Sequence, residues 1–192
     1  MTELRPSLDL AANRRMKKWS ARELAGRALW ETLRAPLFAW TPRPLWSWRR
    51  MLLRLFGARI GADVQIHPSV KIAVPWHVSI DSESSVGDGA ILYSLGRITI
   101  GRRATISQYA HLCAGTHDYT RSDLPLLKLP ITIGDEAWIC AEAFIGPNVN
   151  VGRLAIVGAR AVALKDVPEN TIVAGNPARV LRPRPPVVAP KK

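Results

Sequence analysis

From residue 60 to residue 168 the sequence repeats every six residues, and so short a period excludes most globular folds. The first position of each hexapeptide is aliphatic. These positions hold Ile60, Ile66, Ile72, Ile80, Val86, Leu92, Ile100, Ile106, Leu112, Ile133, Ile139, Ile145, Val151, Val157 and Ala163. The fifth position is small or β-branched throughout, except at Trp76. Six residues are too few for a helical repeat but fit one short strand and a corner, so the period predicts an all-β solenoid.

The number of hexapeptides sets the size of this solenoid. Three sides make one coil of eighteen residues, in which the leading aliphatic side chain points inward and the second position lies at a corner. Glycine is frequent at this second position, as at Gly101 and Gly134, because a corner demands an unusual backbone. The fifteen hexapeptides therefore predict about five coils.

Three interruptions of the period all leave from the same corner. Two extra residues follow His77, two follow Arg97, and fifteen follow His117. Each interruption comes after the third side of a coil, and insertions confined to one edge of a solenoid usually build its binding face. The longest interruption, residues 118–132, is therefore the candidate active-site loop.

Basic residues are concentrated at the two ends of the chain. The net charge is +12, but residues 1–57 carry twelve basic against four acidic residues, and residues 179–192 carry five basic and none acidic. The repeat region is thus nearly neutral. We expect a basic, Trp-rich helical extension at 1–57, a solenoid domain with a closing segment at 58–182, and a disordered, proline-rich tail at 183–192.

Cysteine content and hydropathy bear on the location of the protein. Cys113 and Cys140 are too few and too far apart for a disulfide framework or a zinc knuckle, which favours a reducing compartment. No signal peptide is apparent, and no stretch approaches the roughly 20 apolar residues of a membrane span. We therefore expect a cytoplasmic protein.

Two helices are predicted in the N-terminal extension. Ser20 and Glu23 form a capping-box pattern that begins a helix, and Pro36 is expected to stop it. A second amphipathic face runs from Leu45 to Gly57. Its polar side is expected to carry Arg49, Arg50 and Arg54.

Two interpretations of this extension remain open. Helices before a solenoid commonly cap its open end or pack on a neighbouring subunit. A basic segment rich in Trp and Leu is also typical of a helix at a membrane surface, which would place residues 20–57 against the inner face of a membrane. Nucleic-acid binding is disfavoured, because no recognised reading motif accompanies the charge.

The repeat register separates the four histidines. His67 and His111 fall at positions expected to be structural, whereas His77, Arg97 and His117 share the last position of a third side. That register predicts a row of the three, about 4.8 Å apart per coil. His117 also borders the candidate loop. Because histidine is largely neutral at cellular pH, His117 is the candidate general base, with capping of a turn as the alternative.

A family resemblance now emerges from several segments. They are residues 112–119 (LCAGTHDY), the loop prolines Pro125 and Pro130, the run from Lys165 to Pro168, and residues 175–179 (GNPAR). Together they resemble hexapeptide-repeat acyltransferases with a left-handed parallel β-helix, and most of all the colanic acid biosynthesis acetyltransferases. The latter are similar to galactoside, maltose and nodulation O-acetyltransferases. The resemblance covers nearly the whole chain.

The resemblance implies a homotrimer that binds acetyl-CoA between neighbouring β-helices, uses no metal, and acetylates a sugar hydroxyl for exopolysaccharide or surface polysaccharide synthesis. His117 would deprotonate that hydroxyl, which then attacks the thioester carbonyl. The acceptor would lie against Ser94, Asp118 and Tyr119. The remaining matches concern the cofactor: a backbone N–H near Cys140 or Ala141 for the oxyanion, Ala141 and Ala159 for the pantetheine arm, and Lys165, Arg179 and Arg182 for the phosphates and adenine.

Departures from the family and rival functions are also visible. Ser94 stands where the closer relatives carry an acceptor-binding Asn, and Leu164 stands where a Thr is common. The same fold supports zinc carbonic anhydrases, but Ser122 occupies the place of a required histidine. Two further readings are an N-acetyltransferase acting on an amino sugar and a non-catalytic trimeric scaffold. The sequence does not identify the sugar, the hydroxyl, or whether the acceptor is free, nucleotide-linked or lipid-linked.

Overall fold

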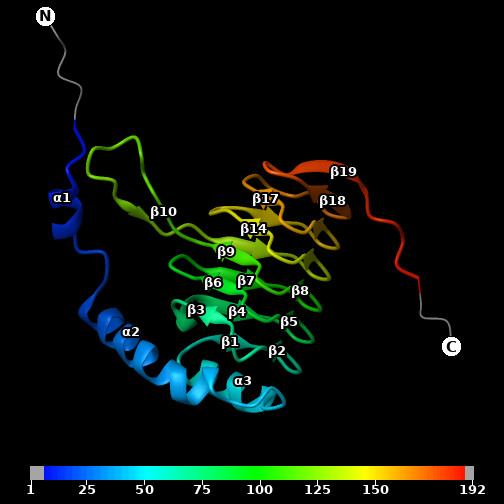
Figure 1. The fold of residues 1–192 in the computed structure, drawn as a ribbon, viewed down its shortest axis with the longest axis horizontal. Coiled ribbons are helices and arrows are strands. Elements are labelled where there is room, and N and C mark those ends of the chain that lie inside the picture. Colours follow the sequence, from blue (N-terminus) through cyan, green and yellow to red (C-terminus); the bar gives the residue numbers. More distant parts are fainter. Residues whose placement is uncertain (1–6, 189–192) are drawn as a thin grey trace, which may run out of the picture.

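The computed structural model describes residues 7–188, and its centre is a solenoid of three sheets in which all strands but the last are parallel (Figure 1). The first sheet consists of β1 (Arg59–Ile60), β4 (Val78–Ile80), β7 (Ile98–Ile100), β12 (Ile131–Ile133) and β15 (Asn150–Val151). The second consists of β2 (Gln65–Ile66), β5 (Ser85–Val86), β8 (Thr105–Ile106), β13 (Trp138–Ile139), β16 (Ile156–Val157), β18 (Thr171–Ala174) and β19 (Arg179–Pro183). The third consists of β3 (Lys71–Ile72), β6 (Ile91–Tyr93), β9 (His111–Cys113), β14 (Phe144–Ile145) and β17 (Val162–Ala163).

The leading aliphatic residues form the core, as the six-residue period predicts. Ile60 pairs with Ile80, Ile80 with Ile100, Ile100 with Ile133 and Ile133 with Val151, so this column stacks along the solenoid axis. All fifteen leading residues are buried, and Ile60 on the first coil is the most exposed at 7%. The left-handed β-helix is confirmed. Val167 and Val173 add two buried sides of a sixth turn beyond the five coils counted from the sequence.

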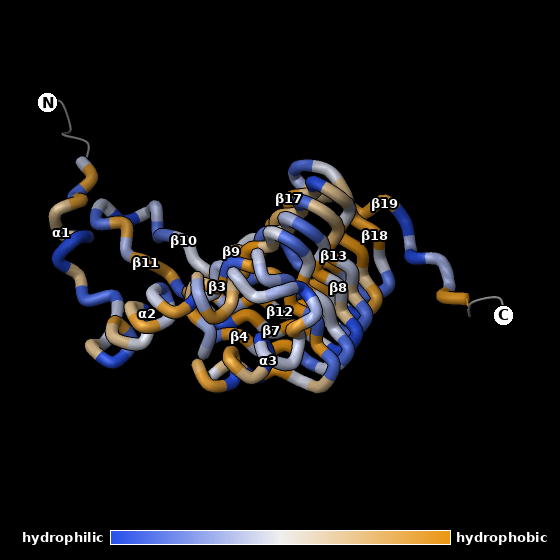
Figure 2. The backbone as a smooth tube through the Cα atoms, turned by 60° about the horizontal axis from the view of Figure 1, so that its bottom comes forward, coloured by the Kyte–Doolittle hydropathy of each residue, from blue (hydrophilic) through white to orange (hydrophobic). Residues whose placement is uncertain are grey.

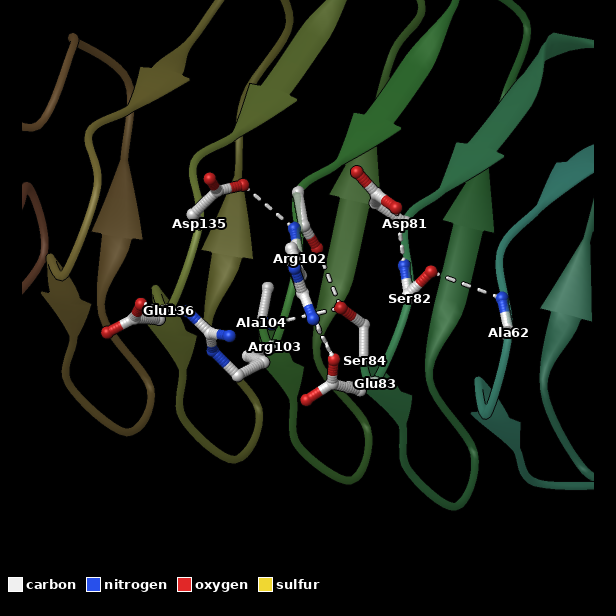
Figure 3. A network of polar contacts seen from close by, with 11 residues as sticks. Ala62, Asp81, Ser82, Glu83, Ser84, Arg102, Arg103, Ala104, Asp135 and Glu136 are labelled. Atoms are coloured by element: carbon white, nitrogen blue, oxygen red, sulfur yellow. Dashed lines mark hydrogen bonds and ion pairs between the residues drawn. The ribbon is translucent and has the colours of Figure 1, made fainter.

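The corners hold successive coils together through backbone contacts and short polar side chains. A Cβ on Gly101 would lie within 3.0 Å of the Asp135 backbone N and side chain, so this corner has room only for glycine. Asp135 in turn accepts a hydrogen bond from the Arg102 N–H at 2.8 Å (Figure 3). On the neighbouring coil, the buried Ser84 hydroxyl donates to the Gly101 carbonyl and accepts from the Ala104 N–H (Figure 3). The corners therefore fix the register between coils.

The three interruptions leave from one corner, but the predicted row of side chains is only partly right. The two short insertions lengthen β4 and β7, and the last two residues of the long one lengthen β12. Val78 pairs with Ile98, and Ile98 pairs with Ile131. The residues that directly precede these three strands are His77, Arg97 and Pro130. Pro130 therefore occupies the third position of the row, where His117 was expected. His117 lies instead in a hairpin, because the loop departs before the row is completed.

From residue 7 onward, three α-helices precede the solenoid: α1 (Leu10–Arg15), α2 (Ala21–Arg34) and α3 (Trp46–Leu55). Ser20 and Glu23 form the predicted capping box at the start of α2, with both reciprocal hydrogen bonds present. Pro36 was expected to stop this helix, but the chain stays helical past it. A π-helical turn, η1 (Ala35–Ala39), follows α2 directly and contains Pro36. A proline can occupy the first turn of a helix, where its missing N–H has no intrahelical partner. Gly57 ends α3 with a φ of +84°.

The N-terminal helices cap the open end of the solenoid. Each coil donates hydrogen bonds from its backbone N–H groups to carbonyls of the following coil, as Gln65 does to Ser84 at 2.9 Å. No coil precedes the first one, so the carbonyls of the first coil have no backbone donor from a coil. Side chains of the extension supply the missing donors. Trp30 donates to the Ile72 carbonyl, Arg49 to Ile66, Arg50 to Val64 and Arg54 to Ile60. The capping interpretation is therefore correct for α2 and α3.

Arg49 differs from its predicted position on the polar side of α3. Its side chain is fully buried and also donates to the Thr41 hydroxyl and the Pro42 and Arg43 carbonyls. Burial lowers the pKa of the Arg49 guanidinium from its ordinary value. The prediction was wrong because helical periodicity assigns every polar side chain to the solvent-facing side of the helix. The first coil beside α3 has buried carbonyls that need a hydrogen-bond donor, and Arg49 turns inward to supply it.

At the other end, β18 and β19 form an antiparallel hairpin that closes the second sheet. The chain keeps contact with the solenoid beyond β19, because the Arg184 side chain donates to the Glu136 and Leu154 carbonyls, each at 3.0 Å. The tail expected from residue 183 thus begins against the solenoid, and residues 189–192 lie outside the described part of the chain. None of the helices described between residues 7 and 188 has the length and hydropathy needed to cross a bilayer.

Candidate functional site

The long insertion forms a hairpin that extends from the solenoid to the N-terminal segment. Strands β10 (Thr116–His117) and β11 (Leu126–Leu127) pair antiparallel, with His117 opposite Leu126. Both ribbon and tube show this hairpin reaching away from the coils and ending beside α1 (Figures 1 and 2). The hairpin therefore fixes the backbone of His117 while leaving its side chain exposed.

A backbone carbonyl determines the tautomer of His117. The ring Nδ1 lies 2.7 Å from the Leu124 carbonyl oxygen, which can only accept a hydrogen bond. Nδ1 must therefore carry the proton. In the neutral ring Nε2 then holds a lone pair, and this nitrogen is able to take a proton from a hydroxyl group. This geometry is what a general base needs.

Two predicted acceptor-binding residues lie next to His117 in the same loop. The Asp118 carboxylate accepts hydrogen bonds from the Thr120 backbone N–H at 3.0 Å and from the Thr120 hydroxyl. The hydroxyl bond is the main reason that the pKa of Asp118 lies below its ordinary value, so the group is ionised at neutral pH. Tyr119 is 87% exposed. Both side chains are thus placed on the surface beside the candidate base.

The third predicted acceptor-binding residue, Ser94, lies inside the solenoid rather than on its surface. Its side chain is fully buried, and its hydroxyl both donates to the Val74 carbonyl and accepts from the Val74 N–H, each at 2.9 Å. The hydroxyl proton and one of its two lone pairs are therefore engaged by Val74 on the coil below. A small polar residue at a tight turn satisfies backbone groups first, which accounts for these two bonds.

The other histidines occupy different surroundings. His77 ends a 3-10 turn, η2 (Pro75–His77), and its Nδ1 lies 3.0 Å from the Ser94 carbonyl. His111 packs edge-on between the rings of Tyr93 and Phe144, and burial lowers its pKa. His67 lies 3.5 Å from an Asp88 carboxylate oxygen. Their contacts are those of packing and local structure, as predicted for His67 and His111.

The predicted oxyanion and pantetheine residues lie at another corner of the prism. Cys140 and Ala141 connect the second sheet to the third, and Ala159 occupies the equivalent place one coil later. The Cys140 N–H already donates to the Val157 carbonyl at 2.9 Å. Within the described residues, the N–H groups of Ala141 and Ala159 make no such bond, so Ala141 rather than Cys140 offers a donor. Burial raises the pKa of the Cys140 thiol, which keeps it protonated.

Two of the three predicted phosphate-binding cations line one pocket. Lys165 and Arg179 border a cavity of about 520 Å³ together with Pro177, Ala178 and Val180. Arg182 is absent from that lining and pairs with Ile172 on β18 instead. Across residues 7–188, no group of three or more His, Cys, Asp or Glu side chains is arranged to hold a metal ion.

Two groups of the sequence-predicted residues therefore lie at different corners. His117, Asp118 and Tyr119 follow the third sheet, whereas Ala141 and Ala159 lie between the second and third sheets. The structure brings the members of each group together but not the two groups. It also adds one residue that no sequence pattern identified, Asn13, whose amide contacts the carbonyl that binds His117. Asn13 and Leu124 are 111 positions apart, and Asn13 falls outside every repeat.

The chain is similar in sequence to known acetyltransferases. No protein-family model matches the chain. Over 156 residues, which are 81% of this chain and 86% of the relative, the sequence is 45% identical to the acetyltransferase WcaF of Escherichia coli (strain K12), named for colanic acid biosynthesis. It is also 27% identical, over 70% of this chain and 68% of the relative, to the galactoside O-acetyltransferase of the same strain.

Solved structures share the fold. A hexapeptide-repeat acetyltransferase of Vibrio cholerae O1 biovar eltor, complexed with acetyl coenzyme A, aligns with a TM-score of 0.79 at 24% identity, covering 89% of this chain and 93% of that one. A maltose O-acetyltransferase of Clostridium difficile 630 aligns with a TM-score of 0.78 at 21% identity, covering 87% and 90%. Because its core is a coiled solenoid with a projecting hairpin and its sequence is 45% identical to WcaF, the chain belongs to the hexapeptide-repeat acetyltransferases.

Proposed function

We propose that the protein transfers an acetyl group from acetyl-CoA to a hydroxyl of a sugar during exopolysaccharide or surface polysaccharide synthesis. The observation that carries the proposal is the Nδ1 hydrogen bond of His117 to the Leu124 carbonyl, which leaves Nε2 as a base in an exposed loop. The name of WcaF supports the polysaccharide context, and the galactoside and maltose O-acetyltransferases support a sugar hydroxyl as the target.

The geometry suggests a direct transfer. His117 Nε2 takes the hydroxyl proton as the sugar oxygen attacks the thioester carbonyl, and an oxyanion forms. The free N–H of Ala141 is the donor available to stabilise that oxyanion. When the oxyanion collapses, the C–S bond breaks and the CoA thiolate leaves, taking the proton from the His117 imidazolium. The products are the acetylated sugar and CoA. Asp118 and Tyr119 adjoin His117 in the same loop and are the acceptor contacts that we propose.

Acetyl-CoA would bind along the corner formed by Ala141 and Ala159 and reach the cavity lined by Lys165 and Arg179. Both cations suit the phosphates, since ammonium and guanidinium groups make strong charge-assisted hydrogen bonds to them. We expect Lys165→Ala to raise the KM for acetyl-CoA about tenfold with little change in kcat, because the phosphates do not react. Lys71→Ala, on the first coil, is the matched control. An unchanged KM would remove Lys165 from the proposed cofactor site.

The experiment that tests the function is a thioester assay with acetyl-CoA against a panel of sugars. The panel holds free, nucleotide-linked and lipid-linked hexoses, with amino sugars as a separate arm. We expect turnover with a hydroxyl acceptor and a loss of about 10²- to 10⁴-fold in kcat for His117→Ala, the usual contribution of a positioned base. His67→Ala should remain close to wild type.

Three outcomes of that assay contradict parts of the proposal. Preference for an amino sugar would identify an N-acetyltransferase instead. Undiminished turnover in His117→Ala would remove the proposed base. Absence of turnover with every acceptor, combined with a cellular phenotype that survives His117→Ala, would favour the non-catalytic scaffold.

The proposal includes a homotrimer in the cytoplasm. A trimer is supported by the separation of the two groups at different corners, because a neighbouring chain can bring its Ala141 corner to the His117 loop. Free Cys113 and Cys140 fit a reducing compartment. Contact with the inner face of a membrane is supported by exposed apolar side chains on and around α3, including Trp40, Trp48 and Leu55. Flotation with anionic lipid vesicles tests that contact, and no co-flotation would contradict it.

A further inference from the structure

The N-terminal segment is bound to the candidate active-site loop through backbone carbonyls of the loop. The Asn13 side chain, on α1, donates from Nδ2 to the Asp123 carbonyl at 2.7 Å and also to the Leu124 carbonyl. The Asp9 backbone N–H donates to the Ser122 carbonyl at 2.8 Å. Three consecutive carbonyls of the loop are thus held by residues 9–13, which the repeat does not include.

The Leu124 carbonyl is shared between Asn13 and His117. It accepts from the His117 Nδ1–H at 2.7 Å and from the Asn13 amide at the same time. Leu124 has a φ of +41°, a backbone conformation that a residue with a branched side chain rarely adopts. Such a conformation persists only where surrounding contacts enforce it. Without the Asn13 contact, the direction of the carbonyl that holds His117 would be less well defined.

Other contacts show that the amide orientation of Asn13 and the position of the loop are well determined. Asn13 Oδ1 accepts from the Lys18 ammonium at 2.6 Å, so the amide nitrogen is the atom that faces the loop. At the far end of the loop, Lys128 donates to the Lys18 carbonyl at 2.8 Å and lies 3.4 Å from the centre of the Trp19 ring. Two parts of the loop, residues 122–124 and Lys128, therefore contact residues 9–19, and the ribbon shows the loop beside α1 (Figure 1).

We propose that Asn13 is a positioning residue for the reaction, which orients His117 by holding the Leu124 carbonyl. This inference rests on the proposed function, because it assigns Asn13 a part in the same base mechanism. Asn13 does not contact the reacting atoms, and its effect passes through one carbonyl oxygen. Small displacements of a catalytic group lower the rate of the chemical step far more than they weaken substrate binding.

The kinetic test compares Asn13→Asp with Arg14→Ala. Aspartate has nearly the shape of asparagine and keeps an oxygen for Lys18, but it lacks the N–H donors. We expect Asn13→Asp to lower kcat about 10- to 100-fold while the KM for acetyl-CoA changes less than about twofold. Arg14, the next residue on α1 and exposed, should tolerate alanine without loss. Asn13→Ala checks that the loss does not come from the introduced negative charge.

A double variant separates positioning from general packing. If Asn13 acts only through His117, then Asn13→Asp should cause no further loss in a His117→Ala background. A loss of equal size in both backgrounds would overturn the inference, and so would wild-type kcat in Asn13→Asp. Thermal unfolding of each variant shows whether the fold is intact.

A spectroscopic readout works without any acceptor. The chain has four histidines, so ¹⁵N-histidine NMR with His117→Ala for assignment can report the tautomer of His117. We expect the Nδ1–H tautomer to predominate in the wild type and in Arg14→Ala, and to lose population in Asn13→Asp. An unchanged His117 signal in Asn13→Asp would overturn the inference. If the wild type transfers no acetyl group, the proposed function fails while this measurement still decides the contact.

Discussion

At the scale of single residues, surroundings decide what each histidine can do. His117 donates through Nδ1 to the Leu124 carbonyl and exposes Nε2, whereas His111 is enclosed between two aromatic rings. The repeat register could separate these two, because it placed His117 at the mouth of a long insertion. The register could not predict the tautomer of His117 or the role of Asn13. Both depend on the Leu124 carbonyl, seven positions from His117, and the folded loop sets the direction of that carbonyl.

The buried ring of His111 provides a prediction on pH. Burial lowers its pKa, and among the described residues its Nε2 has no hydrogen-bond partner. The unfolded chain takes up a proton at the ordinary pKa of histidine, about 6.5, while the folded chain resists it. Stability from this group is therefore complete above that pH and declines as the pH falls below it.

We expect His111→Phe to remove this contribution. Phenylalanine can keep the edge-on contacts with Tyr93 and Phe144 but has no proton to gain. Melting temperatures measured from pH 7.5 to 5.0 should fall less steeply in His111→Phe than in the wild type. Arg22→Met, which alters an exposed residue and leaves all four histidines in place, serves as the control and should follow the wild-type slope. Identical slopes for wild type and His111→Phe would show that His111 does not contribute.

At the scale of elements, the N-terminal helices complete the hydrogen bonding of the first coil. Arg49, Arg50, Arg54 and Trp30 replace the coil that would otherwise precede it. The sequence predicted α2 and α3 from caps and apolar spacing, and it predicted α2's capping box correctly. It could not predict which polar side chain turns inward, because that depends on carbonyls contributed by residues 60–72.

Arg49→Met tests the importance of this cap. The substitution keeps much of the volume but leaves the Ile66 carbonyl and two loop carbonyls without their donor. We expect a loss of about 2–5 kcal/mol in the free energy of unfolding, the usual effect of removing one partner from a buried charged network. Arg49→Lys should restore only part of it, because one ammonium cannot reproduce the guanidinium fork. Urea denaturation measures both.

Arg22→Met is the matched control for this series, since Arg22 lies on α2 and is exposed. Its midpoint of urea denaturation should stay near that of the wild type. If Arg49→Met were equally stable, the capping role of the Arg49 side chain would be contradicted.

At the scale of the whole molecule, the two parts of the proposed site lie at different corners of one chain. The His117 loop follows the third sheet, and Ala141 and Ala159 lie between the second and third sheets. Three chains around a common axis can place each loop against the corner of a neighbour. The proposed trimer thus makes a physical claim, that no single chain holds a complete site.

Subunit mixing tests this claim. Light scattering should give the mass of three 21.2 kDa chains. We expect His117→Ala and Ala159→Trp each to be inactive alone, the first without the base and the second with a ring in the path of the cofactor. Co-expressed, they should form mixed trimers that recover part of the activity, because some sites combine an intact His117 with an intact Ala159. No recovery from confirmed mixed trimers would mean that each site lies within one chain.

The sequence by itself determined the solenoid, its corners, the single edge that carries the insertions, and His117 beside the longest of them. Local periodicity is enough for these, because each hexapeptide buries its own aliphatic residue and stacks on its neighbours. Only the tertiary structure decided that Arg49 is buried, that the Ser94 hydroxyl donates to the Val74 carbonyl, and that the Asn13 amide donates to the Leu124 carbonyl. Each of these depends on hydrogen-bonding groups contributed by a distant part of the chain, and a local pattern does not record them.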